Sequence, residues 1–488
     1  MKKNCWGYKY YFCDVARKNK RVELSNIKVT DYAAEGKALA KIDGKVIFVS
    51  GAVPGDTVDV LLTKNKKDWA EARVTQIQSY SAERVDAFCR HFGICGGCKW
   101  QMLPYQKQLE YKQQEAVQNL RRIGKIEATE WLPIVGADDT QAYRNKLEFT
   151  FSNKRYLLPQ EIAQPGEAKQ ENALGFHVPR IFDKVIDIEE CYLMQDVNNT
   201  IRNSIRTFAL EKGFSFYDIR QHTGWLRNII IRYCSTGELM VNICINYEAE
   251  EDRKALLDYL LLEVPQITTL LYTINPKWND SIYDLEPQVY FGKGYVMEQL
   301  RAGAHEVYQF MVSPKSFFQT NTRQAEKLYG IARDFAGLTG TETVYDLYCG
   351  TGSIGIFVSG RAKKIIGVEV VEDAIEDAKK NAALNNISHA HFFAGDVIKI
   401  CNTDFFEQHG RPDVVITDPP RAGMHEKLVN KLLEMEAPKI VYVSCNTATQ
   451  ARDLLLLSEK YVVEKVQPVD MFPHTHHIEC VALLTLKK

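Results

Sequence analysis

The sequence has no long apolar run and no recognisable leader. Among its 488 residues there is no stretch of about 18 uninterrupted apolar residues, the length that a membrane-spanning helix requires. The first residues, Met1–Trp6, lack the apolar core of a secretory signal peptide. These absences predict a cytoplasmic protein with no membrane partner.

The sequence also has no excess of either charge, so its net charge does not identify a polyanionic partner. Lys and Arg number 61, and Asp and Glu number 62. The distribution is more informative, because residues 1–90 hold 17 Lys or Arg and 11 Asp or Glu. Residues 1–21 are therefore expected to form a basic tail, and a solvated charged surface is the alternative explanation of this composition.

The length predicts several domains, since one domain commonly has roughly 150 residues. Residues 22–80 contain short alternating segments separated by turn signals, which predicts a small closed β-barrel of a kind that often binds oligonucleotides. Residues 81–310 combine a charged helical segment with alternating segments and predict an α+β middle domain. In residues 311–488 helices alternate with short apolar strands, which predicts an α/β fold with a doubly wound parallel sheet.

Three chemical motifs follow predicted strands in this last segment. Asp346–Gly352 reads Asp-Leu-Tyr-Cys-Gly-Thr-Gly, Asp418–Arg421 reads Asp-Pro-Pro-Arg, and Ser444–Asn446 reads Ser-Cys-Asn. Open α/β sheets bind ligands in the crevice outside the carboxyl ends of their strands. The three motifs are therefore expected to face one crevice, with Cys445 as the candidate nucleophile.

The glycine turn predicts a nucleoside-containing cofactor. Glycine lets the backbone adopt φ > 0 and approach a ligand closely, and no Lys-Ser/Thr follows that would make a P-loop. Glu369 ends the next predicted strand, where its carboxylate can accept both ribose hydroxyls. Asp396 ends a third strand and is the candidate for the adenine amino group. This order resembles the class I S-adenosylmethionine methyltransferases, and a nicotinamide enzyme is the alternative.

A cysteine beside such a cofactor favours a pyrimidine as the methyl acceptor. An amine is already nucleophilic, whereas C5 of a pyrimidine must be activated by adding a thiolate to C6. Cys445 supplies the thiol, and Glu479 is the candidate for the base that later removes the C5 proton. Arg421 is expected to contact RNA phosphate or the uracil carbonyls. Arginine or histidine neighbours are expected to lower the pKa of Cys445 from about 8.5.

The segment that holds Glu479 also contains three histidines, His474, His476 and His477. A zinc site would need further convergent ligands, and the proposed chemistry does not require a metal. The histidines are therefore interpreted as orienting or phosphate-facing groups.

Together these motifs resemble the RNA uracil-5-methyltransferase family, most closely its TRAM-containing, iron–sulfur members that modify 23S ribosomal RNA. Phe-Phe-Gln-Thr-Asn at 317–321 and Phe-Pro-His-Thr-His-His-Ile-Glu at 472–479 extend the resemblance. It implies a class I (Rossmann-like) methyltransferase domain, a TRAM barrel, Cys445 as nucleophile and Glu479 as base. The implied cofactor contacts are Gln319, Tyr348, Glu369 and Asp418, with Gly350 in the turn and the less exact matches Ser353 and Asp396.

Twelve cysteines occur, and three of them are crowded into ten residues as Cys89-x5-Cys95-x2-Cys98. This density predicts a metal or cluster site, with zinc and His91 as one alternative. Radical S-adenosylmethionine enzymes usually show Cys-x3-Cys-x2-Cys, so this spacing argues against their chemistry. The family resemblance implies a [4Fe-4S] cluster with Cys191 as fourth ligand, and thiolate-only ligation suits iron–sulfur. A structural or a redox role is compatible with this site.

The expected function is transfer of a methyl group from S-adenosylmethionine to C5 of a uridine in RNA. The uridine must be flipped out or presented in a loop, because C5 is inaccessible in a stacked helix. Ribosomal RNA is the expected partner and transfer RNA the second, because transfer RNA enzymes of this kind generally lack both barrel and cluster. The alternative from another class is a noncatalytic RNA-binding iron–sulfur protein, and a monomer is expected.

Overall fold

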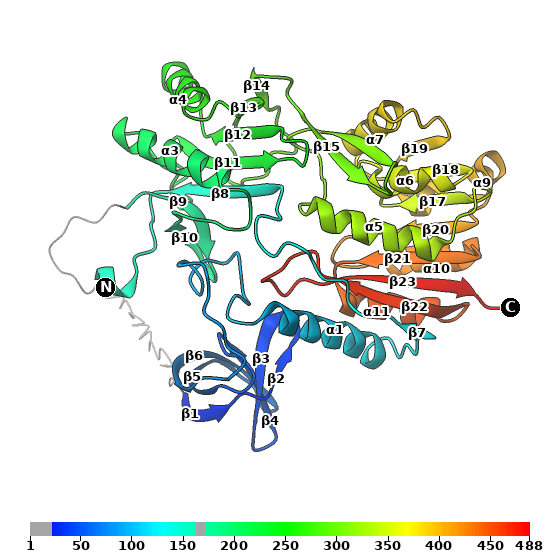
Figure 1. Ribbon diagram of the computed structural model, residues 1–488, viewed down its shortest axis with the longest axis horizontal. Helices are drawn as coiled ribbons and strands as arrows, with labels where there is room; N and C mark the ends of the chain where they lie inside the picture. The colour runs from blue at the N-terminus through cyan, green and yellow to red at the C-terminus, as the bar shows by residue number, and fades with distance from the viewer. Residues whose placement is uncertain (1–21, 163–170) are drawn as a thin grey trace, which may run out of the picture. The chain divides into compact units, whose positions relative to one another are not determined.

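The computed structural model describes residues 22–162 and 171–488 (Figure 1). The predicted basic tail, residues 1–21, lies outside the described residues. Internal contacts divide the chain into two units. Of the described residues, 22–33 and 37–84 form the first unit, and those within 34–36 and 85–488 form the second. Within the described ranges, no helix is long and apolar enough to cross a membrane.

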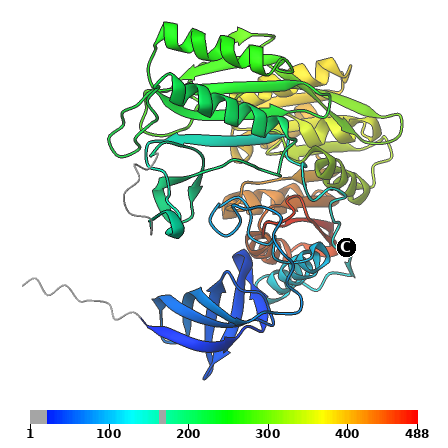
Figure 2. The ribbon, with the colours of Figure 1, turned by 60° about the vertical axis from the view of Figure 1, so that its left-hand side comes forward.

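The first unit is strand-rich, as predicted, and surrounds a small apolar core. Every second residue of a strand points to the same face, so Val58 and Val60 enter the core with Ala70 and Ala72 of the next strand. Figure 2 shows the strands wrapped around this core. In sheet order they are β1 (Glu23–Lys28), β5 (Thr57–Asn65), β6 (Trp69–Ser79), β4 (Lys45–Ser50), β3 (Lys37–Ile42) and β2 (Asp31–Ala33).

A mixed sheet forms the middle of the chain, with helices on one face. Ile229 and Ile231 point to the same side as Val241 and Ile243 of the neighbouring strand and pack under α3 (Val197–Glu211) and α4 (Glu250–Glu263). A short helix, α2 (Pro159–Ile162), comes between β8 and β9 in the sequence. The sheet order is β10 (Ile181–Asp187), β9 (Ala173–Val178), β8 (Lys146–Ser152), β11 (Leu226–Tyr233), β12 (Leu239–Ile245), β13 (Thr269–Ile274) and β14 (Gln288–Phe291).

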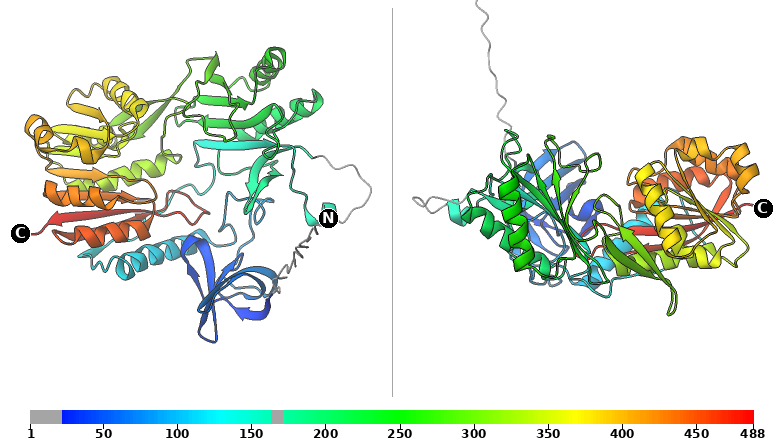
Figure 3. Two further views of the ribbon diagram at one scale, coloured as in Figure 1. Left: turned by 180° about the vertical axis from the view of Figure 1, so that it is seen from behind. Right: turned by 90° about the horizontal axis from the view of Figure 1, so that it is seen from above.

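The C-terminal sheet is covered on both faces, as the apolar strands predicted. Along β21 (Lys439–Ser444), Val441 and Val443 enter one core, whereas Ile440 and Tyr442 enter the other. The helices of one face are α5 (Thr322–Ala336), α6 (Ser353–Val358) and α7 (Glu372–Leu384) (Figure 3). Those of the other are α1 (Tyr105–Arg122), α10 (Glu426–Met435) and α11 (Thr447–Leu457). Short helices α8 (Val397–Ile400) and α9 (Thr403–His409) lie between strands.

The sheet is not parallel throughout, which corrects the sequence expectation. Strand β23 (Glu479–Leu486) runs antiparallel to both of its neighbours, because it follows β22 (Tyr461–Val469) through a loop with no helical crossover. The sheet order is β19 (Ala390–Ala394), β18 (Lys364–Glu369), β17 (Thr343–Leu347), β20 (Val414–Thr417), β21, β23 (Glu479–Leu486), β22 (Tyr461–Val469) and β7 (Glu130–Trp131).

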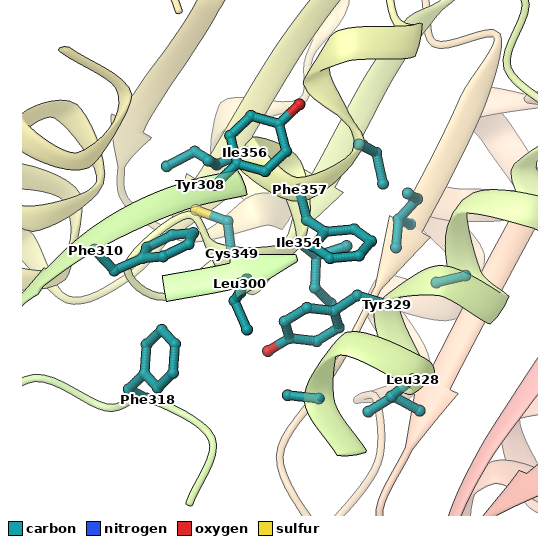
Figure 4. Packing of buried hydrophobic residues seen from close by; sticks show 14 of the residues in the cluster. Leu300, Tyr308, Phe310, Phe318, Leu328, Tyr329, Cys349, Ile354, Ile356 and Phe357 are labelled. Carbon is teal, nitrogen blue, oxygen red and sulfur yellow. The ribbon is translucent and has the colours of Figure 1, made fainter. Parts of the chain in front are cut away.

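Two pieces of the predicted middle segment pack with this C-terminal sheet. Strand β7 pairs with β22, and α1 packs on α11. The ribbon of β15 (Val296–Arg301) and β16 (Val307–Val312) adds Leu300 and Phe310 to the core under α5 and α6. Figure 4 shows Leu300 and Phe310 with Phe318, whose ring centroid lies 5.5 Å from that of Phe310. A boundary after residue 310 thus falls inside β16, because strand alternation does not reveal which core a ribbon joins.

Candidate active site

Cys445 lies at the carboxyl end of β21, as predicted. In the antiparallel pair of β21 and β23, Ser444 is the partner of Cys480. Continuing this register by one position sets Cys445 opposite Glu479, the first residue of β23. Directly opposed residues in an antiparallel pair have Cβ atoms about 4.5–5.5 Å apart. The thiol and the carboxyl group predicted as nucleophile and base are therefore neighbours at one strand end.

The loop before Glu479 is anchored on α1. Asp470 accepts hydrogen bonds from the Lys112 ammonium at 2.6 Å and the Tyr105 hydroxyl at 2.9 Å, and the Lys112–Asp470 pair is fully buried. His474 donates its backbone N–H to Gln108 Oε1 at 2.8 Å, and its Nδ1 lies 3.1 Å from Gln108 Nε2. Burial lowers the pKa of His474 to about 4. This histidine is therefore a neutral group that orients the loop, which is one of the two roles expected for the three histidines.

Two other segments hold the same loop. The His474 carbonyl accepts hydrogen bonds from the backbone N–H groups of Lys99 at 2.8 Å and Trp100 at 3.1 Å. Asn321, the N-cap of α5, donates from Nδ2 to the Met471 carbonyl at 2.9 Å. Two segments therefore converge on the loop that leads to Glu479: residues 99–100, directly after Cys98, and the start of α5.

Acidic side chains crowd this end of the sheet. Burial raises the pKa of Asp346 and that of Asp418 to about 7. Burial and Asp418 raise the pKa of Glu479 well above its ordinary value, and Arg421 opposes the shift. Burial, followed by Glu479 and Asp418, raises the pKa of Cys445 to about 11. The expected lowering of the thiol pKa is thus wrong for the free protein, because burial and two carboxyl groups outweigh Arg421.

The glycine turn leaves β17 with three residues in the left-handed region. The φ angles are +62° at Tyr348, +52° at Gly350 and +77° at Gly352. Such a conformation costs a non-glycine residue about 1 kcal/mol or more, so Tyr348 is strained. Gly350 donates its N–H to Glu369 Oε2 at 3.3 Å, and a Cβ at Gly350 would meet no atom within 4 Å. The carboxylate of Glu369 thus braces a turn whose outer side is open to a ligand.

A cavity of about 450 Å³ lies beside this turn, within the range of small-molecule sites of about 300–1,000 Å³. Three residues predicted to contact the cofactor line it: Tyr348, Glu369 and Asp396. The sequence did not single out its apolar wall, which includes Val370, Ile398 and Leu428. Val370 is 64% exposed, which is unusual for a large aliphatic side chain. These aliphatic side chains were not predicted, because the motifs identified only the polar residues near them, such as Glu369 before Val370 and Asp396 before Ile398.

The remaining predicted cofactor residues are not among those that line this cavity in the described part of the chain. Asp418 follows β20 and belongs to the acidic group around Glu479. The Gln319 carbonyl accepts a hydrogen bond from Asn145 Nδ2 at 2.9 Å. Ser353 is buried at the start of α6, with its hydroxyl 3.2 Å from that of Thr351. Of the predicted cofactor residues, Tyr348, Glu369 and Asp396 therefore line the cavity, whereas Asp418 lies in the crevice beside Glu479.

A second cavity brings together the four predicted cluster ligands, which come from two distant segments: Cys89, Cys95, Cys98 and Cys191. Phe88, Phe92 and Ile188 supply apolar parts of its wall. The Gly97 N–H donates to Cys95 Sγ at 3.3 Å. Burial raises the pKa of Cys95 to about 12 and that of Cys98 to about 11. The thiols are therefore protonated unless a positive charge is placed among them.

The zinc alternative has less support at this cavity. His91 lines it, but its Nε2 accepts a hydrogen bond from the Glu189 backbone N–H at 3.2 Å. Among the described residues, no group of three or more His, Cys, Asp or Glu side chains is arranged to hold a metal ion.

Comparison with known proteins extends over nearly the whole chain. Residues 284–487 match the family model "tRNA (Uracil-5-)-methyltransferase", and residues 18–83 match the TRAM domain. An uncharacterized RNA methyltransferase of Bacteroides thetaiotaomicron is 54% identical over 458 residues, which cover 93% of this chain and 100% of that protein. Another from Porphyromonas gingivalis is 51% identical over 465 residues, or 94% and 99% of the two chains. The chain belongs to the TRAM-containing RNA uracil-5-methyltransferase family. It is an S-adenosylmethionine-dependent RNA methyltransferase.

A solved structure supports this RNA methyltransferase assignment. The tRNA (uracil-54, C5)-methyltransferase of Pyrococcus abyssi, in complex with S-adenosyl-L-homocysteine, superposes with a TM-score of 0.71 at 27% identity. The match covers 95% of this chain and 100% of that one. It confirms the predicted methyltransferase fold.

Proposed function

We propose that this methyltransferase acts on C5 of a uridine, with Cys445 as nucleophile and Glu479 as base. The observation that carries the proposal is the pairing of Ser444 with Cys480, which brings Cys445, directly after β21, close to Glu479, the first residue of β23. The Cys445 thiol first loses its proton to water, and attack of the resulting thiolate on C6 then forms an S–C6 bond and moves the C5–C6 π electrons toward C5 and O4. After C5 has gained the methyl group, Glu479 removes the C5 proton. The released electron pair restores the C5–C6 double bond and expels the thiolate.

The acidic crevice fits a cationic cofactor. Asp346 Oδ1 is buried without a hydrogen-bond partner, and nearby carboxyl groups raise one another's pKa. S-adenosylmethionine carries a sulfonium and an ammonium group, and when bound it supplies an electrophilic methyl group. The cavity beside the glycine turn suits its adenosine part. We assign the cofactor contacts to Gln319, Tyr348, Gly350, Glu369 and Asp418, with Asp396 near the base and Ser353 behind the turn.

The proposed substrate is 23S ribosomal RNA, on the resemblance to the branch of the family that has both a barrel and a cysteine cluster. Transfer RNA is the second candidate, and the Pyrococcus abyssi enzyme is the observation that favours it. Both RNAs are found in the cytoplasm, where we expect the protein to act.

We also propose that the four cysteines of the second cavity hold a [4Fe-4S] cluster. In such a cluster each cysteine binds its own iron, whereas zinc draws all its ligands to one ion at about 2.3 Å for sulfur. The support for the cluster is that all four thiols line one cavity, since thiolate-only ligation suits iron–sulfur. The test is the iron and sulfide content of anaerobically purified protein. Cys95→Ala should lose both, whereas Cys401→Ala, which removes a buried thiol elsewhere, should retain both.

The methyl transfer is tested with unmodified 23S ribosomal RNA and transfer RNA transcripts, S-adenosylmethionine and mass spectrometry of the digested RNA. The expected product is 5-methyluridine on one transcript, absent with Cys445→Ala and present with Cys401→Ala. Glu479→Gln should accumulate a protein–RNA adduct that survives denaturation, because the S–C6 bond cannot be released without loss of the C5 proton. A folded, cofactor-binding protein that methylates neither RNA would overturn the proposal in favour of a noncatalytic RNA-binding role.

A further inference from the structure

A tryptophan in the middle segment is rigidly mounted and yet exposed. Trp278 is 76% exposed. Its indole ring lies parallel to the imidazole of His222, with 4.7 Å between ring centroids and an interplanar angle of 4°. Since His222 covers one face of the indole, the exposure belongs to the opposite face and the ring edges.

The loop that carries Trp278 is built around a buried arginine. Arg227, 1% exposed, donates to the Asn275 carbonyl at 2.7 Å, the Asn279 carbonyl at 3.0 Å and Asp280 Oδ1 at 2.8 Å. The Asn275 side chain closes the loop by donating to the Asn279 carbonyl at 2.9 Å. The loop is therefore fastened to β11, and the position of Trp278 is set before any partner arrives.

A second turn fixes the ring beneath the indole. Asp218 is 1% exposed, and its Oδ1 accepts hydrogen bonds from the backbone N–H groups of Arg220 at 2.9 Å and Gln221 at 3.1 Å. His222 has φ of +56°, in the left-handed region that few non-glycine residues adopt. Its Nδ1 lies 3.1 Å from the Tyr217 hydroxyl. The imidazole is therefore held in place by both backbone and side-chain contacts.

The same turn presents a cation beside another exposed ring. The Arg220 guanidinium lies 5.0 Å from the ring centroid of Phe182, which is 62% exposed. Arg220 also pairs with Asp183 at 2.5 Å. Single exposed apolar residues are common on protein surfaces. An open indole on a fixed support, with an arginine over an aromatic ring in the same turn as that support, is a more specific arrangement.

We propose that Trp278, supported by His222, is a stacking platform for an unpaired base of the RNA substrate, with Arg220 in the same turn as His222. The inference rests on the proposed RNA methylation. Every base offers a π face, and single-stranded RNA is bound by aromatic side chains and arginine planes. Stacking alone does not select a particular base, so the platform adds affinity without sequence preference.

The platform engages RNA outside the nucleotides that enter the crevice. Strand β11 starts at Leu226, close to both turns, and ends at Tyr233, whose N–H donates to the Asn145 carbonyl at 2.9 Å. Asn145 in turn holds the Gln319 carbonyl. At about 3.3 Å per residue, this strand alone separates the platform from the Gln319 segment by roughly 25 Å.

The test is RNA binding without S-adenosylmethionine, measured by fluorescence anisotropy with labelled 23S ribosomal RNA fragments, a transfer RNA transcript and a single-stranded oligonucleotide. Trp278→Ala removes the ring on which one base is proposed to stack, and it should therefore weaken binding about tenfold. Trp278→Phe keeps a ring and should stay within about threefold of the wild type. Leu262→Ala, at a residue 78% exposed on α4, should bind as the wild type does.

A second readout is spectroscopic. Stacking should quench part of the tryptophan emission of the wild type on RNA addition, and this part should be missing in Trp278→Phe. His222→Ala should reduce both quenching and affinity, because the indole loses its support. Unchanged affinity of folded Trp278→Ala for all three RNAs would overturn the platform and leave a protein partner as the occupant. The binding assay does not depend on methyl transfer, so the two proposals can fail separately. If the wild type methylates neither RNA but Trp278→Ala still weakens RNA binding, only the proposed function is overturned.

Discussion

The buried ion pair between Lys112 and Asp470 can be broken with little change in shape. Lys112→Met keeps the aliphatic stem and removes the ammonium group. Asp470 then remains buried with two donors, the Tyr105 hydroxyl and the Phe472 N–H at 3.0 Å. Removing one partner of a buried pair costs about 3–5 kcal/mol, and the two remaining donors favour the lower end, about 3 kcal/mol. Asp470→Asn should cost less, because burial lowers the pKa of Lys112 and an unpaired lysine can release its proton.

The assay is urea unfolding followed by circular dichroism for wild type, both single variants and the double variant. The double variant should lose less than the sum of the single losses, since neither unpaired charge remains. Lys107→Met is the matched control on the same helix. Its partner Glu110 is at the surface, so this change should cost about 1 kcal/mol or less. The reasoning is refuted if Lys112→Met and Lys107→Met unfold at the same urea concentration.

Three further predictions concern the crevice. In the native state Asp346 keeps its proton up to about pH 7, whereas in the unfolded chain it loses it near pH 4. The protonated carboxyl group therefore stabilises the fold fully below about pH 4, and this stabilisation is lost as the pH rises toward 7. Urea midpoints of Asp346→Asn should therefore vary less over this pH window than those of the wild type. Alkylation of Cys445 by iodoacetamide, followed by mass spectrometry, should be slow at neutral pH and rise toward pH 11. Glu479→Gln should move that rise to lower pH, and an unchanged profile would contradict the contact. Gly350→Ala should weaken cofactor binding in calorimetry more than it lowers the melting temperature. Gly352→Ala should do the reverse, because its Cβ would lie 2.9 Å from a buried ring.

The positions of the motifs were predictable from the sequence because each follows an apolar run. Asp346, Glu369 and Cys445 all lie at the carboxyl ends of strands, and a strand that is buried on both faces is readily recognised. This local pattern was enough to predict the class of fold and the edge of the sheet at which the site lies.

Pairings between distant segments were not predictable in the same way. The opposition of Cys445 and Glu479 depends on β23 running antiparallel, and no local pattern encodes strand direction. The partner of His474 could not be predicted, because Gln108 is 366 positions away in the sequence. The raised pKa of Cys445 is a sum over burial and several neighbours, so considering arginine or histidine neighbours alone predicted the wrong sign.

The contribution of α1 and β7 to the C-terminal sheet has a consequence for synthesis. About 330 residues separate Trp131 of β7 from Tyr461, where its partner β22 begins. As the chain emerges from the ribosome, the buried side of α1, with Ala116 and Leu120, must wait for the last strands to be translated. Contacts this remote in sequence form late and leave apolar surface exposed in the meantime. The nascent chain is therefore prone to aggregation until β22 and β23 have been translated.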